Sequence, residues 1–237
     1  MRGGVFPDQG IGQALDPALN VMSTMPTKVK ICGLKTEAAL EAALGGGADY
    51  VGFVFFPPSP RNIAPAMAKL LAAKAHGRAK VVALVVDPDD ALIAEVVAAA
   101  APDLIQLHGS ETLARVAEIR ARWGIPVMKA VPVETADDAG AARRFSPATD
   151  LILFDARAPA ESTRPGGNGA PFDWRMLLGL EYEVPFMLSG GLTPDNVAEA
   201  IRLTGETIVD VSSGVESRPG EKDPELIRRF LRAAKGV

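Results

Sequence analysis

Residues 80–107, KVVALVVDPDDALIAEVVAAAAPDLIQL, contain the structural unit from which the rest of the fold can be predicted. A short apolar run at residues 80–86 is followed by an Ala-rich stretch at 89–100, whose apolar residues recur at three- and four-residue spacing. A second apolar run follows at 104–107. Short runs that are apolar on both faces are typical of buried parallel strands, and the middle spacing is typical of a helix. The stretch therefore predicts a strand, a helix and a second, parallel strand.

The same alternation continues from residue 28 to the end of the chain. It predicts strands at residues 29–32, 50–56, 80–86, 104–107, 127–131, 151–154, 186–188 and 207–211. Helices are expected at 36–44, 64–75, 89–100, 111–122, 136–145, 173–178, 194–203 and 224–234. Eight such units predict an α/β fold, a single (β/α)8 TIM barrel of eight parallel strands that spans residues 28–237. The alternation of strands and helices, taken alone, is also compatible with an open, doubly wound sheet.

Residues 1–27 do not share this rhythm. The segment MRGGVFPDQGIGQALDPALNVMSTMPT mixes Gly, Pro and Gln and has neither helical nor strand periodicity. It also lacks the continuous apolar core of roughly 7 to 15 residues that a signal peptide needs. Because its composition is typical of disordered segments, we expect residues 1–27 to form a flexible extension outside the catalytic domain.

Charge and composition argue against several classes of partner. The chain has 25 basic and 29 acidic side chains, a net charge of −4, so no basic field is available to hold nucleic acid. Apolar residues never run for the roughly 20 positions that a bilayer crossing needs. One cysteine and two histidines predict neither an internal disulfide nor a zinc site. We expect a cytoplasmic protein without nucleic-acid or membrane contact, and the choice between a monomer and a homodimer stays open.

In such a barrel, binding and catalytic groups lie in the loops after the carboxyl ends of the strands. Reactive side chains occur at five of these predicted ends. Cys32 ends the first strand, Arg61 follows the second, His108 follows the fourth, Asp155 ends the sixth and Asp210 lies on the last. We therefore expect these five residues at one face of the barrel.

Two glycine-containing loops follow the last two predicted strands. The segment LSGGLTPDN (188–196) follows the seventh strand, and SSG (212–214) follows the eighth. Glycine lets backbone N–H groups approach a ligand closely, and in barrels these two loops commonly bind phosphate together. We therefore expect a phosphorylated ligand that contacts Gly190, Gly191, Ser213 and Gly214.

Several segments occur together in the order and spacing of a known family. They are KICGL (30–34), GADYVGFVFFPPSPR (47–61), QLHGSE (106–111), GGNGAPFDW (166–174), LSGGLTPDNV (188–197), DVSSGVES (210–217) and GEKD (220–223). With these segments the chain resembles phosphoribosylanthranilate isomerases over nearly all of residues 28–237. It departs from the family pattern at Asn168, where Thr is usual, and at Ser189, where Ala is usual.

The resemblance implies an enzyme of tryptophan biosynthesis that uses no cofactor and no metal. The implied reaction is the Amadori rearrangement of N-(5-phosphoribosyl)anthranilate to 1-(2-carboxyphenylamino)-1-deoxyribulose 5-phosphate. The resemblance assigns the general base to Cys32 and the general acid to Asp155. It also implies a loop that closes over the phosphate, to which Gly167 and Gly169 contribute backbone.

The chemistry of these residue types suits the implied roles. Opening a furanose ring requires a proton delivered to its oxygen, and forming the enolamine requires a proton removed from C2′. A thiol has a reference pKa of about 8.5, so the site must favour the thiolate of Cys32, for which Lys35 and nearby N–H dipoles are candidates. Burial behind residues 151–154 would help Asp155 to hold a proton. The planar fork of Arg61 suits the anthranilate carboxylate.

Several of these residues also fit a purely structural role. A lone cysteine is frequently a buried core residue, and Arg61 alone would more often be a solvated surface charge. His108 is expected either to line the pocket or to stabilise its loop, and Asp210 either to bond the substrate or to support the barrel floor. The long segment after Asp155 is expected to act as a lid, with a passive linker as the alternative.

Two other functions share part of this pattern. A related barrel isomerase of histidine synthesis performs the same chemistry, but that family has Asp where this chain has Cys32. A non-catalytic phosphate-binding barrel would keep the glycine loops and lose the acid and the base. Since Cys32 and Asp155 are both present, the sequence favours the isomerase.

Because residues 1–24 have no predicted packing role, a chain that starts at Met25 should fold and turn over substrate like the full chain. Its melting temperature, measured by scanning calorimetry, should lie within about 5 °C of the full-length value. For a domain of this size, 5 °C corresponds to roughly 1 to 2 kcal/mol. A larger decrease would show that the extension packs on the barrel.

Overall fold

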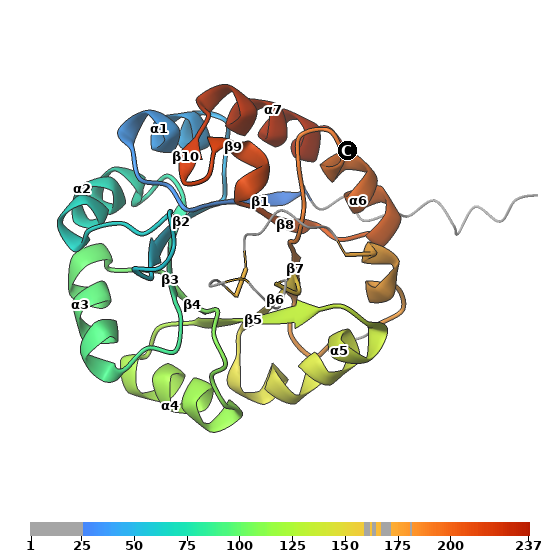
Figure 1. Ribbon diagram of the computed structural model, residues 1–237, viewed down its shortest axis with the longest axis horizontal. Helices are drawn as coiled ribbons and strands as arrows, with labels where there is room; N and C mark the ends of the chain where they lie inside the picture. The colour runs from blue at the N-terminus through green and yellow to red at the C-terminus, as the bar shows by residue number, and fades with distance from the viewer. Residues whose placement is uncertain (1–25, 159–161, 163–164, 167–171, 181) are drawn as a thin grey trace, which may run out of the picture.

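The computed structural model describes residues 26–158, 162, 165–166, 172–180 and 182–237, and the predicted extension therefore lies almost wholly outside the described residues. The described chain forms a closed barrel of parallel strands with helices around it (Figure 1). The strands are β1 (Lys28–Cys32), β2 (Tyr50–Phe55), β3 (Lys80–Val85), β4 (Leu104–Leu107), β5 (Val127–Val133), β6 (Leu151–Ala156), β7 (Phe186–Leu188) and β8 (Ile208–Val211). Because β1 pairs with both β2 and β8, the predicted barrel is confirmed and the open sheet is excluded.

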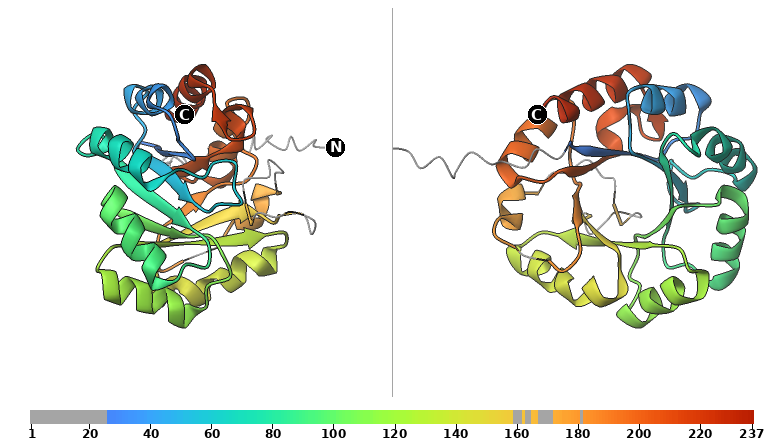
Figure 2. Two further views of the ribbon diagram at one scale, coloured as in Figure 1. Left: turned by 60° about the vertical axis from the view of Figure 1, so that its left-hand side comes forward. Right: turned by 180° about the vertical axis from the view of Figure 1, so that it is seen from behind.

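The helices form an outer ring around these strands, which the view from behind in Figure 2 shows clearly. They are α1 (Glu37–Gly45), α2 (Pro65–Ala75), α3 (Asp90–Ala100), α4 (Leu113–Trp123), α5 (Ala136–Ala141), α6 (Val197–Thr204) and α7 (Pro224–Lys235). The 3-10 helix η2 (Ala142–Ala148) continues α5, and η3 (Trp174–Leu177) lies between β6 and β7. The ring covers the outward faces of the strands.

Both faces of the strands are buried, as the apolar runs predicted. A small cluster inside the barrel contains Val82, Leu104, Met128 and Met187. The large cluster lies between the strands and the helices and includes residues of both, such as Ile31 and Leu40. A sheet that closes on itself can bury its inner face without a second layer, and this is why every strand of the chain can be apolar on both sides.

Three predicted helices differ from the structure. The helix expected at residues 136–145 is α-helical only to Ala141 and continues as the 3-10 helix η2. The helix expected at residues 194–203 begins only at Val197, since residues 193–196 form a turn in which the Thr193 N–H donates to Asn196 Oδ1 at 2.7 Å. The helix expected at 173–178 is a single 3-10 segment, η3. In the last two places a residue favoured at helix starts, Pro194 or Asp173, begins a tighter turn instead of an α-helix.

A short hairpin that the sequence did not predict follows β8. The 3-10 helix η4 (Ser213–Val215) leads into β9 (Glu216–Arg218), which pairs antiparallel with β10 (Glu221–Lys222). The hairpin packs closely on the loop after β2, because a Cβ added at Gly220 would lie 2.4 Å from the Pro60 carbonyl oxygen. Residues 216–222 thereby reach the same face of the barrel as Arg61.

The start of β1 and the end of α7 meet at the opposite face. Lys235 Nζ donates to the Thr27 carbonyl oxygen at 3.2 Å and to Asp49 Oδ2 at 2.9 Å. The same carboxylate oxygen accepts from the Val29 N–H at 2.8 Å. Thr27, the residue before the predicted boundary at 28, is itself buried. Within the described residues, no helix is long and apolar enough to span a membrane.

Substitution of Gly214 by Ala should destabilise the protein, because an added Cβ would lie 1.9 Å from the Leu192 carbonyl oxygen. The loops after β7 and β8 would have to separate, and overpacking of this kind costs about 1–3 kcal/mol. Urea unfolding measures the change. Gly45→Ala is the control, since its Cβ would meet nothing within 4 Å, and it should be neutral or slightly stabilising. Equal midpoints for both variants would contradict the close packing of the two loops.

Candidate active site

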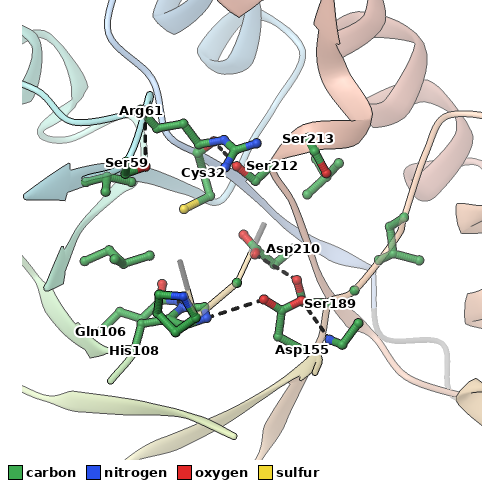
Figure 3. A pocket seen from close by; sticks show the side chains of 18 of the residues that line it. Cys32, Ser59, Arg61, Gln106, His108, Asp155, Ser189, Asp210, Ser212 and Ser213 are labelled. Atoms are coloured by element: carbon green, nitrogen blue, oxygen red, sulfur yellow. Dashed lines mark hydrogen bonds and ion pairs between the residues drawn. The ribbon is translucent and has the colours of Figure 1, made fainter. Parts of the chain in front are cut away.

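A pocket opens where the carboxyl ends of the strands meet. All five side chains predicted from the strand ends line it, as Figure 3 shows: Cys32, Arg61, His108, Asp155 and Asp210. They come from five different strands or the loops that follow them. These residues therefore converge at one face of the barrel, as expected from the strand ends.

Cys32 lies at the end of β1 with 3% of its surface exposed. Burial raises the pKa of its thiol, and the nearby Asp210 carboxylate acts in the same direction. The ammonium groups of Lys30 and Lys222 oppose this effect and favour the thiolate. Lys35, the cation suggested by the sequence, instead donates to the Pro60 carbonyl oxygen at 2.7 Å, so that suggestion was wrong.

A buried ion pair lies beside the thiol. Lys30 precedes Cys32 by two residues, so both side chains point to the inner face of β1. Lys30 Nζ is 2.9 Å from Asp210 Oδ1, and the Ser189 hydroxyl donates to Asp210 Oδ2 at 3.1 Å. Burial alone would lower the pKa of Lys30, but Asp210 and Cys32 raise it above its ordinary value. Both oxygens of Asp210 are therefore occupied by protein donors.

Asp155 belongs to a separate group of polar side chains on the other side of the barrel. His108 Nε2 is 3.4 Å from Asp155 Oδ2, and His108 Nδ1 is 2.9 Å from Gln106 Nε2. Gln106 also lines the pocket, and its buried Oε1 has no hydrogen-bond partner among the described residues. His108 thus lines the pocket and also contacts the carboxyl group of Asp155. Sequence reasoning missed Gln106, although it faces the same side of its strand as His108.

Arg61 is buried, with 5% of its surface exposed, so the alternative of a solvated surface charge is wrong. Its Nε and Nη2 donate to the two oxygens of Glu216 at 2.7 and 2.9 Å. Glu216 Oε1 also accepts from Lys222 Nζ at 2.6 Å. Sequence reasoning assigned no role to Glu216 or Lys222, although both lie in segments that carry the family resemblance.

Burial and charged neighbours shift the pKa values of Glu216 and Lys222. Burial would raise the pKa of Glu216, but Arg61 and Lys222 hold it below its ordinary value. Burial lowers the pKa of Lys222 to about 8, against the opposing effect of Glu216. Near pH 8 Lys222 is therefore partly neutral, whereas Glu216 stays ionised.

The glycine loops lie at the mouth of the same pocket. Gly190, Gly191 and Ser213 line it, and both glycines have left-handed backbone, with φ of +83° and +68°. Trp174 Nε1 lies 3.4 Å from the Gly190 carbonyl oxygen and so anchors the loop after β7. Gly214 provides the close contact to the neighbouring loop. Gly167 and Gly169 lie outside the described residues, and so does Asn168.

The described residues contain no group of three or more His, Cys, Asp or Glu side chains placed to hold a metal ion. What the pocket offers chemically is a thiol, a carboxyl group and a guanidinium group, each held by a different set of neighbours. Such a set can remove a proton, deliver a proton and bind an anion.

Proteins of known family share this sequence over most of its length. The family model for N-(5′-phosphoribosyl)anthranilate (PRA) isomerase matches residues 29–233. A protein named N-(5′-phosphoribosyl)anthranilate isomerase from Rhodopseudomonas palustris (strain BisA53) is 59% identical over 213 residues, covering 90% of this chain and 98% of the relative. A second, from Bradyrhizobium diazoefficiens, is 56% identical and covers 90% and 96% of the two chains.

Solved structures of the same family also superpose on this chain. Phosphoribosyl anthranilate isomerase from Thermotoga maritima superposes with a TM-score of 0.78 at 36% identity, covering 89% of this chain and 100% of the other. An isomerase in complex with reduced 1-(o-carboxyphenylamino)-1-deoxyribulose 5-phosphate gives a TM-score of 0.75 at 34% identity, with the same coverage. By sequence and by fold, the chain belongs to the N-(5′-phosphoribosyl)anthranilate isomerase family.

Proposed function

We propose that the protein catalyses the Amadori rearrangement of N-(5-phosphoribosyl)anthranilate to 1-(2-carboxyphenylamino)-1-deoxyribulose 5-phosphate in tryptophan biosynthesis, with Cys32 as the base and Asp155 as the acid. The observation that supports it best is the presence of a thiol from β1 and a carboxyl group from β6 in one pocket. These strands are not neighbours in the barrel, so the two groups can act on different atoms of one substrate. The direct test is incubation of purified protein with the substrate, whose fluorescence should disappear.

Ring opening and formation of the enolamine need two proton transfers in order. Asp155 donates a proton to the furanose ring oxygen, the C1′–O bond breaks, and the anilino nitrogen supplies the electron pair that forms the C1′=N bond. Cys32 then removes the proton from C2′, the C2′–H electron pair forms the C1′=C2′ bond, and the π electrons of the C1′=N bond return to nitrogen, which gives the enolamine. In the final tautomerisation the hydroxyl on C2′ loses its proton and C1′ gains one, which gives the ketone. Asp155 and Cys32 thus account for the proton transfers of ring opening and of enolamine formation.

The raised pKa of Cys32 has two effects on the base. It lowers the fraction of thiolate at neutral pH, which costs about 1.4 kcal/mol for each unit. It also makes the thiolate that does form a stronger base toward C2′. The charges of Lys30 and Lys222 act against this loss of thiolate, because they lower the pKa of Cys32. Asp210 is a weaker candidate for the base, because both of its oxygens already accept from Lys30 and Ser189.

The ends of the substrate bind apart from the reacting carbons. The phosphate is assigned to the loops of Gly190, Gly191, Ser213 and Gly214, where left-handed backbone and close packing allow N–H groups to face an anion. Gly167 and Gly169 are proposed to contribute from the lid. Arg61 is assigned to the anthranilate carboxylate. A base that must stay a free thiol suits a reducing cytoplasm.

Alkylation by iodoacetamide should report the state of the thiol directly, because Cys32 is the only cysteine. Burial and the raised pKa both reduce the amount of reactive thiolate, so labelling at pH 7.5 should be at least about tenfold slower than for a free thiol. The rate should rise steadily up to about pH 9, since more thiolate forms as pH increases. Protein unfolded in urea is the control and should label at the free-thiol rate. A fast, pH-independent rate in the folded protein would mean that the thiol is already ionised.

Cys32→Ser should lose on the order of 10² to 10⁴ in kcat, equivalent to about 3 to 5 kcal/mol of barrier, because a hydroxyl is a far poorer proton acceptor. Asp155→Asn should lose a similar factor, since the amide cannot deliver the proton. The unfolding midpoint of each variant, measured beside kcat, separates catalysis from stability. If Cys32→Ser kept more than a tenth of the kcat, the C2′ proton would have to go to another group.

A further inference from the structure

Glu216 lies immediately behind Arg61 as seen from the pocket. Arg61 lines the pocket, whereas Glu216 and Lys222 lie outside its lining. The side chain of Glu216 is 5% exposed and that of Lys222 is 2% exposed, so the ion pair between them is buried. A buried charge this close to the site is costly to keep unless its partners are fixed.

The contact between Glu216 and Arg61 uses one particular edge of the guanidinium group. Glu216 accepts from Nε and Nη2, which form the side-on edge. A guanidinium group has five N–H donors in a rigid plane, and a second carboxylate can bind at the edge formed by Nη1 and Nη2. With the side-on edge taken, that end-on edge is the one left for a ligand.

The charges of the group favour an incoming anion. Arg61 and Lys222 carry positive charges and both contact the negatively charged Glu216, so the three side chains together have a net charge of +1 when Lys222 is protonated. One carboxylate from a ligand would balance this excess. Because the group is buried, the interaction is weakly screened by water.

We propose that Glu216 is a positioning residue, which holds Arg61 with its end-on edge toward the pocket for the carboxylate of the substrate's aromatic ring. This proposal rests on the role assigned to Arg61 under the proposed function. Glu216 itself touches no substrate atom. Its contribution is to fix the plane of the guanidinium group before the ligand arrives, which reduces the entropy lost on binding.

The hairpin also links the carboxylate site to the base. Lys222 Nζ donates to the Ser212 carbonyl oxygen at 2.9 Å, and the Ser212 hydroxyl donates to the Cys32 carbonyl oxygen at 3.2 Å. The close approach of Gly220 to Pro60 joins the same hairpin to the loop that carries Arg61. The hairpin thereby sets the distance between the group that binds the carboxylate and the group that removes the proton.

Two ligands separate positioning of Arg61 from a general structural effect. The first is reduced 1-(o-carboxyphenylamino)-1-deoxyribulose 5-phosphate, and the second is the same compound without the ring carboxylate. Glu216→Gln should bind the first about tenfold more weakly than the unaltered protein does, and the second within about twofold of it. The KM for substrate should rise by a similar factor, while kcat stays within about twofold, because the carboxylate is remote from the reacting carbons.

Glu221→Gln is the matched control. Glu221 lies on the same hairpin but is exposed and pairs with Arg218, so its substitution should change neither ligand's affinity. Glu216→Asp keeps the charge on a shorter side chain and should lose less affinity for the carboxylated ligand than Glu216→Gln. If Glu216→Gln does not fold, Glu216→Asp carries the test alone, and it should still weaken the carboxylated ligand selectively.

Arg61→Ala distinguishes failure of this proposal from failure of the one on which it rests. It should weaken only the carboxylated ligand, and adding Glu216→Gln to it should cause no further selective loss. If Arg61→Ala has no selective effect, the role of Arg61 is wrong. If Arg61→Ala is selective but the Glu216 variants are not, or if they weaken both ligands equally, the positioning role of Glu216 is wrong. Turnover by the unaltered protein tests the proposed reaction independently.

Discussion

The parallel pairing of the first strand with the last is the constraint on which the rest of the structure depends. Lys30 of β1 is the register partner of Asp210 of β8, so closing the barrel places their side chains together inside it. Neither charge is tolerable there alone, because removing one partner of a buried ion pair costs about 3–5 kcal/mol. The pair therefore favours a single register of closure, in which Cys32 lies next to the loop that begins at Ser212.

The pocket built on this closure has two electrostatically distinct sides. The side formed by β1, β8 and the hairpin contains buried cations, namely Lys30, Lys222 and Arg61, each with an acidic partner. The side formed by β4 and β6 contains Asp155 with His108. A thiolate benefits from nearby cations. The arrangement of charges thus suits a thiolate base on the side that contains Lys30 and Lys222.

The sequence predicted the strands within one or two residues, because short runs that are apolar on both faces and lie between turn residues are typical of buried strands. It also predicted which side chains share a face, since the carboxyl ends of parallel strands all point the same way. The predicted start of α6 was wrong because a proline after a threonine is equally compatible with a turn. The contact between Arg61 and Glu216 was missed for a different reason. The two residues are 155 positions apart, and nothing local to either residue specifies its partner.

The hairpin was missed because its strands are only three and two residues long, too short to show any periodicity. Its sequence, ESRPGEK, is typical of an exposed loop. Only its packing on the loop after β2 turns two of its charged residues into buried ones. The positions of Glu216 and Lys222 therefore follow from tertiary contacts, whereas the positions of the reactive residues follow from strand order.

The contact of Lys235 with Thr27 and Asp49 has a consequence for how this chain can be joined to others. It holds the start of β1 and the end of α7 together on the face opposite the pocket. A further domain fused at Val237 would therefore leave the mouth of the barrel open. The same proximity means that a short peptide between Val237 and Pro26 would suffice for a circular permutant, with new ends cut into a surface loop elsewhere.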